Sequence, residues 1–224
     1  MARAALFDVD GTLVDTNHLH VVTWWEAFRQ AGHDVSTHDI HRAIGLGSDD
    51  LIEHLLGAER DHDQDATLSA AHTALYGTYF ERLPSLDGAR RLLRELSGRG
   101  WRIVLATSAG GPELKALRRA IDADDVIAGV ASADDVSDGK PAPDPVQRAL
   151  ELAESEPSDA VFVGDTVWDM KAAGAAGVRA VALLAGGIAR ADLEEAGASA
   201  VYEDPAELLS HLDTSIFAQM ERKD

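Results

Sequence analysis

The chain of 224 residues carries 39 Asp and Glu against 20 Lys and Arg, which gives a formal charge of −19, and 46% of its residues are hydrophobic. This hydrophobic content excludes a disordered chain, and the length allows one or two domains with a sizeable core. The charge disfavours nucleic acid and anionic membranes as partners, while the absence of Cys excludes disulfides, thiolate catalysis and zinc–thiolate sites.

The apolar segments are too short to direct the chain into or across a membrane. Residues 4–7 are followed at once by Asp8 and Asp10, so this run is shorter than the hydrophobic region of a signal peptide. The longest uncharged apolar stretch, residues 180–189, is shorter than the ~20 residues that span a bilayer. We therefore expect a cytoplasmic protein without a membrane partner. The sequence does not indicate its oligomeric state.

Short apolar segments alternate with helical patterns along most of the chain. Four segments, each bounded by Gly or Asp, have the composition of strands buried on both faces of a parallel sheet: residues 4–7, 101–106, 160–163 and 178–184. Helical patterns lie between them at residues 86–96, 113–121, 145–152 and 165–176. This alternation predicts an α/β fold with a parallel sheet.

One region interrupts the alternation. From residue 15 to residue 84 no strand is expected, and apolar residues recur at helical spacing with breaks at Gly32, at 45–47 and near Gly57. We interpret it as an all-α helical cap, residues 15–84, inserted into a core formed by residues 1–14 and 85–224. The cap holds eight of the nine His residues, whose spacing gives little support for a histidine metal site. Residues 219–224 are expected to be a frayed tail.

Polar side chains gather where the predicted strands end, and ligands of open α/β sheets bind beyond the carboxyl ends of the strands. Converging carboxylates repel each other and need a cation, and oxygen ligands without Cys favour Mg²⁺ over zinc. The residues therefore predict a metal–carboxylate site beside a hydroxyl and a lysine able to hold a phosphate. The side chains concerned are Asp8 and Asp10, Thr107 and Ser108, Asp165 and Asp169, and Lys140 in a loop between turn-forming residues.

Four segments of the chain resemble the motifs of a known family. They are Asp8-Val9-Asp10-Gly11-Thr12-Leu13-Val14, Thr107-Ser108, Gly139-Lys140-Pro141 and Gly164-Asp165-Thr166-Val167-Trp168-Asp169. In order and spacing they resemble the four motifs of the haloacid dehalogenase (HAD) superfamily, and the resemblance covers nearly the whole chain. The insertion after the first motif is similar to the helical cap of the branch that holds phosphoglycolate phosphatases and β-phosphoglucomutases. The resemblance implies a Rossmann-like core with a helical cap.

The resemblance also implies a role for each matched residue. Asp8 would be the nucleophile that forms an aspartyl-phosphate, and Asp10 would be the general acid for the leaving group and then the base for water. Mg²⁺ would be held by the Asp8 carboxylate, the Asp10 backbone carbonyl and Asp165. Thr107 would hydrogen-bond the transferring phosphoryl group, and Lys140 would pair with both that group and Asp8.

Further residues are expected around this centre, and for some of them a purely structural role is an alternative. Asp169 would orient Lys140 or a water on the metal, although an acid in the first turn of a helix is often only solvated. For Trp24 a packing role is as well supported as a substrate contact, and loop 45–48 is equally well explained as a helix–helix turn. The residues expected to contact phosphate or substrate are Ser108, Gly11 and Thr12 with their backbone N–H groups, and, in the cap, His20, Trp24, Gly47 and Ser48.

These expectations favour a Mg²⁺-dependent phosphatase acting on a small phosphorylated metabolite. The alternatives are a phosphomutase, a dehalogenase, which Asp10 disfavours, and a non-catalytic binding protein, which is disfavoured because no catalytic residue is missing. A phosphonate hydrolase would need a lysine in the cap. The lysines are residues 115, 140, 171 and 223, all outside the cap, which excludes this function. Asp49 and Gly110-Gly111 stand where the mutase branch has cations for a second phosphate. We therefore expect phosphate release without sugar-phosphate isomerisation.

Overall fold

A single parallel sheet forms the centre of the computed structural model, which describes residues 2–221. Its six strands lie in the order β3-β2-β1-β4-β5-β6, and every neighbouring pair is parallel. They are β1 (Ala4–Phe7), β2 (Arg102–Ala106), β3 (Ile127–Ala131), β4 (Ala160–Gly164), β5 (Arg179–Leu183) and β6 (Ala198–Tyr202). The predicted α/β fold is confirmed. β3 and β6 were not predicted, because these edge strands are only partly buried and no continuous apolar run marks them.

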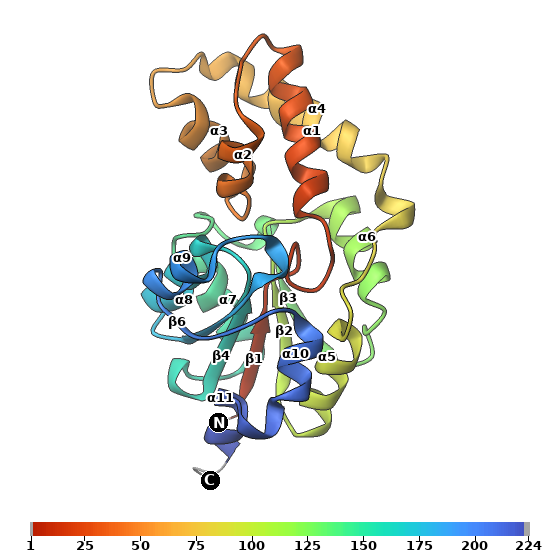
Figure 1. The fold of residues 1–224 in the computed structure, drawn as a ribbon, viewed down its shortest axis with the longest axis vertical. Coiled ribbons are helices and arrows are strands. Elements are labelled where there is room, and N and C mark those ends of the chain that lie inside the picture. Colours follow the sequence, from red (N-terminus) through yellow and green to blue (C-terminus); the bar gives the residue numbers. More distant parts are fainter. Residues whose placement is uncertain (1, 222–224) are drawn as a thin grey trace.

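Helices cover both faces of the sheet (Figure 1). Ala5 and Phe7 of β1 pack toward one face, whereas Ala4 and Leu6 pack toward the other, so β1 carries no polar side chain. The helices of the first face are α5 (Ala89–Gly98), α6 (Gly111–Ile121), α10 (Pro205–Ser210) and α11 (Ile216–Glu221), and those of the second are α7 (Asp144–Ala153), α8 (Val167–Ala175) and α9 (Arg190–Glu195).

The end of the described chain is ordered. Residues 219–221 belong to α11, and Met220 is buried, so the expected frayed tail is wrong for these residues. Residues 222–224 lie outside the described part. Among residues 2–221 no helix is both long and apolar enough to cross a membrane.

Four helices between β1 and β2 lie together beyond the carboxyl ends of the strands (Figure 1). We call them the cap helices: α1 (Asn17–Gln30), α2 (Thr37–Ala43), α3 (Ser48–Leu56) and α4 (Asp65–Gly77). They share a small apolar core of their own around Trp24, Phe28 and Ile52. Short 3-10 helices complete the structure at His62–Gln64, Phe80–Arg82, Ala133–Asp135, Pro157–Asp159, Leu184–Gly186 and Leu212–Thr214.

The start of α8 places two of the acidic residues of interest. The sequence predicted a helix from residue 165, but α8 begins at Val167 because Thr166 is its N-cap. The Thr166 hydroxyl accepts a hydrogen bond from the Asp169 backbone, and the Asp169 side chain reaches back to the Thr166 backbone, which forms a capping box. Asp165 is thereby left in the turn at the end of β4.

Candidate active site

The side chains singled out from the sequence meet at the carboxyl ends of the central strands. Asp8 follows β1, Thr107 follows β2, and Asp165 follows β4. The strand order reverses at β1, and this is the place where open α/β sheets bind ligands. Between these strand ends and the cap helices lies a cavity of about 70 Å³, whose lining includes Asp8 and Asp10 from the core and Trp24 from the cap.

Lys140 joins two carboxylates in the floor of the site. Its ammonium group contacts the Asp8 carboxylate and lies 2.8 Å from Asp169 Oδ1, and its side chain is only 1% exposed. Asp169 Oδ2 accepts hydrogen bonds from the Thr166 backbone and hydroxyl, at 3.0 and 2.6 Å. Burial alone would lower the pKa of Lys140, but Asp169 and Asp8 outweigh it and raise this pKa above its ordinary value. Lys140 therefore remains a buried cation between Asp8 and Asp169.

Asp165 is held by two donors from the other side of the site. Thr12 Oγ1 donates to Asp165 Oδ1 at 2.8 Å, and Asn17 Nδ2 donates to Asp165 Oδ2 at 2.7 Å. Glycine is required beside this carboxylate, since a Cβ on Gly11 or Gly186 would lie 2.4 or 1.8 Å from Asp165 Oδ2. Burial first, and then the nearby Asp169, raises the pKa of Asp165 to about 7.

The donor set fits a divalent cation. Asp8, Asp165 and Asp169 are buried, and carboxylate oxygens of the three lie within 4.8 Å of one another. Burial and the charges of Asp169, Asp165 and Asp10 raise the pKa of Asp8 well above its ordinary value, although Lys140 opposes them. The single positive charge of Lys140 thus does not balance the negative charge of the three carboxylates. Hard oxygen ligands of this kind suit Mg²⁺.

Asp10 belongs to a second group of side chains, which joins the core to the cap. Its Oδ1 accepts a hydrogen bond from the Thr16 hydroxyl at 2.6 Å and lies 3.2 Å from His20 Nε2. His20 Nδ1 lies 3.1 Å from His72 Nε2, and Glu113 Oε1 lies 3.6 Å from His20 Nε2. Carboxylate oxygens of Asp10 and Glu113 and a ring nitrogen of His20 all lie within 4.8 Å of one another.

The charges of this second group follow from its contacts. Burial would raise the pKa of Asp10, but the hydrogen bond and charge of His20, with help from Thr16, lower it. Burial would lower the pKa of His20, and its contact with Asp10 and the charge of Glu113 raise it instead. Burial and the His20 charge lower the pKa of His72 to about 2, so the His72 ring is neutral and its Nε2 can accept from His20 Nδ1.

The remaining expected residues lie at the site in different ways. Thr107 is buried at the end of β2, and its hydroxyl accepts a hydrogen bond from the Ala109 backbone at 3.0 Å. Ser108 and Ser48 line the cavity. Gly47 does not line it, but lines a neighbouring groove of about 770 Å³ that shares Ser48 and Ser108 with the cavity. Trp24 lines the cavity and also stacks on His72, with ring centroids 4.2 Å apart, so both of its expected roles have support.

The expected phosphate cradle at Gly11 and Thr12 is corrected by the structure. The Gly11 N–H donates to Val14 O at 2.8 Å, and the Thr12 N–H donates to Val9 O at 3.3 Å. These N–H groups close the turn after β1 and are not free to bind phosphate. The contribution of Thr12 is instead its hydroxyl, which holds Asp165.

Several residues of the site were not predicted. Thr16 and Asn17 stand at the start of α1, His72 lies in α4, and Glu113 lies in the first turn of α6. Asn17 and Asp165 are 148 positions apart in the chain, and His20 and His72 are 52 apart. No local spacing reveals such contacts, because the packing of the cap on the core creates them.

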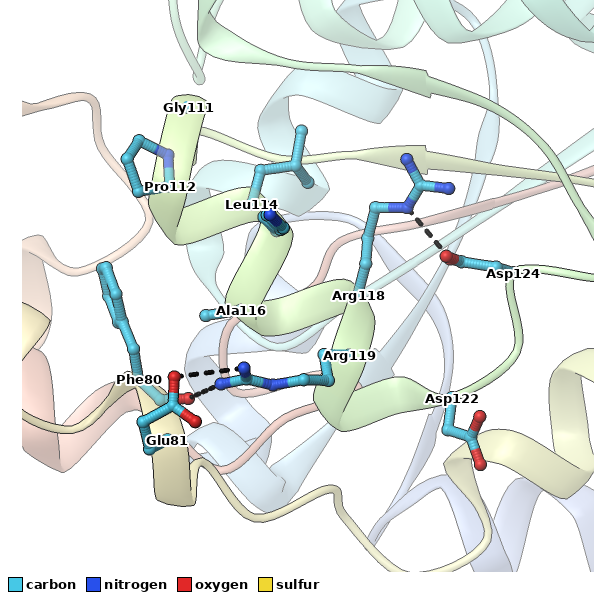
Figure 2. Close-up of a pocket in the computed structure, with 11 residues that line it drawn as sticks. Phe80, Glu81, Gly111, Pro112, Leu114, Ala116, Arg118, Arg119, Asp122 and Asp124 are labelled. Carbon is cyan, nitrogen blue, oxygen red and sulfur yellow. Dashed lines mark hydrogen bonds and ion pairs between the residues drawn. The ribbon is translucent and has the colours of Figure 1, made fainter.

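A wider pocket of about 820 Å³ lies against α6 but outside this site (Figure 2). Arg118 pairs with Asp124 at 2.9 Å, and Arg119 pairs with Glu81 at 3.1 Å and donates to the Phe80 carbonyl. None of the expected catalytic residues lines this pocket. Arg118 and Arg119 are thus engaged by neighbouring acceptors, and we assign the pocket no role in the chemistry.

Comparisons with known proteins identify relatives over most of the chain. The chain is 31% identical over 219 residues to a phosphoglycolate phosphatase of Rhodospirillum rubrum, with 93% of this chain and 90% of that protein covered. It is 27% identical over 195 residues to the pyrophosphatase PpaX of Bacillus cereus, with 81% and 82% covered. A crystal structure of a hydrolase from Pseudomonas syringae superposes with a TM-score of 0.90 at 34% identity and covers 95% of this chain and 98% of that one.

The family model of haloacid dehalogenase-like hydrolases matches residues 2–177, which include all four motifs. This match confirms the resemblance drawn from the sequence, and the phosphatase names of the relatives support the expected class of enzyme. The chain belongs to the haloacid dehalogenase-like hydrolase family.

Proposed function

We propose that this phosphatase hydrolyses a small phosphorylated metabolite in a Mg²⁺-dependent reaction, through an aspartyl-phosphate on Asp8. The observation that carries the proposal is the position of the Asp8 carboxylate. It is fixed by the buried Lys140, faces a cavity that Asp10 also lines, and lies within 4.8 Å of the Asp165 carboxylate. A nucleophile, a cation for the phosphoryl group and an acid–base group are thus supplied together.

The nucleophilic step needs the Asp8 carboxylate in its anionic form. Lys140 favours this form, and its ammonium group would also pair with the transferring phosphoryl group. The Thr107 hydroxyl would donate to the same group from the end of β2. Mg²⁺ held by Asp8, the Asp10 backbone carbonyl and Asp165 would neutralise charge between the nucleophile and the phosphate.

Asp10 would handle the protons of both half-reactions. The negative charge of a bound phosphate favours the protonated form of Asp10, which then gives its proton to the leaving oxygen. The contacts with Thr16 and His20 lower the pKa of Asp10 and so restore the carboxylate, the form that takes a proton from the attacking water. Asp169 would hold Lys140 in place.

The division of the chain is part of the proposal, with a core of residues 1–14 and 85–224 and a cap of residues 15–84. It is supported by the two connecting segments, which run side by side. Val14 and Ser85 form an antiparallel bridge, and the Asp15 N–H donates to Pro84 O at 2.9 Å. Both connections between the cap and the core therefore pass through one short hinge.

Removal of divalent cations is expected to abolish phosphate release. The experiment screens the purified protein against phosphorylated metabolites and p-nitrophenyl phosphate in EDTA, and then with added Mg²⁺. Excess EDTA should stop the reaction and Mg²⁺ should restore it, because the carboxylates around Lys140 are otherwise left in excess over cations. Full turnover in EDTA would contradict the metal dependence. No turnover of any phosphate ester with Mg²⁺ would contradict the function.

Replacement of Asp10 with Asn is expected to lower kcat by on the order of 10²–10⁴-fold, because the amide cannot transfer a proton. Initial rates on p-nitrophenyl phosphate and on an alkyl phosphate measure the effect. The alkyl ester should suffer more, since its leaving group needs the proton more. Asp15→Asn is the matched control, since Asp15 is exposed and lies in the same loop. A loss of only a few-fold on both substrates would mean that water handles the protons unaided.

A further inference from the structure

The cavity beside Asp10 offers a substrate negative charge, and its described lining residues include no lysine or arginine. We propose that this enzyme selects phosphate esters of small alcohols that carry an ammonium group and discriminates against esters that carry a second anion, with Glu113 as the specificity-determining residue. This inference rests on the proposed phosphatase function. It concerns the leaving alcohol of the substrate, and four observations support it.

Glu113 is placed where the leaving alcohol would lie. It lines the cavity from the first turn of α6, and its side chain is 25% exposed. One of its carboxylate oxygens lies within 4.8 Å of an Asp10 carboxylate oxygen. Since Asp10 would protonate the ester oxygen, a group two or three bonds beyond that oxygen comes within hydrogen-bonding reach of Glu113.

The described lining of this cavity lacks the permanent positive charge of a lysine or arginine. None of its described lining residues is Lys or Arg. Lys140 is buried between Asp8 and Asp169, where it would serve the transferring phosphoryl group. Arg42 of the cap pairs with Asp192 at 2.9 Å and does not line the cavity. Among the described lining residues, a second anion on the substrate would therefore find only His20 as a cation, and Asp10 and Glu113 already flank that ring.

The cations of α6 are directed elsewhere. Arg118 and Arg119 line the pocket of Figure 2, and both are paired with acidic side chains there. Lys115 also lines that pocket and not the cavity. α6 thus presents Glu113 to the cavity and its three basic side chains to another surface.

The groove outside the cavity extends the negative charge toward solvent. It has a volume of about 770 Å³, and it shares Leu46, Ser48 and Ser108 with the cavity lining. Its described lining residues include no Lys or Arg, and its acidic residues are Asp49, Asp50, Glu53 and Asp138. Partial burial and the charges of Asp49, Glu53 and Asp138 raise the pKa of Asp50, as expected in a negative field. Such a field attracts a cationic group and repels a second anion.

Three phosphate esters of nearly equal size test the proposal: phosphoethanolamine, 2-hydroxyethyl phosphate and phosphoglycolate, which end in an ammonium, a hydroxyl and a carboxylate. Phosphate release gives kcat/KM for each with Mg²⁺. We expect the order ammonium, hydroxyl, carboxylate, with a ratio of about 100 between the first and the last, as expected for a partly screened charge contact. A highest kcat/KM for the hydroxyl or the carboxylate ester would overturn the proposal.

Burial and the Asp10 charge, opposed by His20, raise the pKa of Glu113 to about 7, so the comparison is made at about pH 8, where Glu113 is ionised. There Glu113→Gln should lower the ammonium-to-carboxylate ratio by about tenfold or more, because it removes one charge from the cavity at nearly constant shape. The matched control is Glu195→Gln, which makes the same charge change at an exposed position in α9 and should leave the ratio unchanged. A residue that merely positioned His20 would change all three rates in parallel. An unchanged ratio in Glu113→Gln would contradict the assignment of Glu113.

The wild-type enzyme gives a test that depends on no variant. Added salt should lower kcat/KM for phosphoethanolamine relative to 2-hydroxyethyl phosphate and raise it for phosphoglycolate, because salt screens attraction and repulsion alike. Salt dependences of the opposite sign would overturn the proposal. Failure of the proposed function has a different signature, since p-nitrophenyl phosphate would then also release no phosphate with Mg²⁺.

Discussion

Replacing Asp8 with Asn should lower the rate of phosphate release by on the order of 10⁴-fold or more. Loss of the nucleophile alone can cost an enzyme about as much rate as loss of all its catalytic residues together. The amide has the shape of the carboxylate but no anionic oxygen to attack phosphorus. The fold should persist, because Lys140 keeps its contact with Asp169 at 2.8 Å. Burial and three neighbouring carboxylates already disfavour the charge on Asp8, so its removal relieves repulsion.

Initial rates with saturating Mg²⁺ and thermal unfolding in EDTA measure the two parts of this expectation. Asp15→Asn is again the control, and it should behave as the wild type in both measurements. Appreciable turnover by Asp8→Asn with the wild-type KM would refute the assignment of the nucleophile. A large loss of stability would instead show that the variant had lost its fold, and the rate would then carry no information about chemistry.

Replacing Lys140 with Met should cost about 3–5 kcal/mol in the free energy of unfolding at pH 7 in EDTA, the usual cost of leaving a buried charge without its partner. Met preserves the length of the side chain and can still pack on Phe162, whose ring lies 5.5 Å from the ammonium. The loss is therefore electrostatic, since Asp8 and Asp169 are left without the cation that they share. Activity should fall with it, because the phosphoryl group loses the same cation.

The pH dependence separates this explanation from a loss of packing. Burial raises the pKa of Asp8 and Lys140 opposes the rise, so the variant should raise it further. A carboxyl group whose pKa is raised by folding destabilises the folded protein at pH values above the pKa that the group has in the unfolded chain. The stabilities of wild type and variant should therefore converge as the pH falls toward 3.8, the ordinary value for Asp.

Chemical denaturation in EDTA over this pH range makes the comparison. Lys171→Met is the matched control, since Lys171 is exposed and lies over the Trp168 ring at 4.8 Å. It should change stability by no more than about 0.5 kcal/mol. A difference between Lys140→Met and wild type that stays constant with pH would mean that packing, and not charge, explains the loss.

The four central strands could be predicted from the sequence because their composition is set by burial on both faces. Ala4 to Phe7 is a continuous apolar run, and so is the segment that forms β4. The edge strands gave no such signal, since Gly129 and Ser199 interrupt them and their side chains are partly exposed. Helix boundaries shifted where a cap decided them, as Thr166 does for α8.

The convergence of the candidate site residues could be predicted because they directly follow strands that end at one edge of the sheet. Asp8 and Asp165 are brought together by β1 and β4, which are neighbours. The side chains that hold or flank this centre depend on how the cap meets the core, which no local pattern records. Asn17 reaches Asp165 from α1, and Glu113 faces His20 only because α6 packs beneath the cap.

Rapid acid quenching during turnover, followed by mass spectrometry, shows whether Asp8 carries the phosphoryl group. A fraction of the enzyme should gain the mass of one phosphoryl group, and fragmentation should place this group on Asp8. The labelled fraction should rise in Asp10→Asn with an activated substrate such as p-nitrophenyl phosphate, because hydrolysis of the aspartyl-phosphate then lacks its base. Steady release of phosphate with no labelled enzyme in either protein, or a phosphoryl group on another residue, would contradict the account.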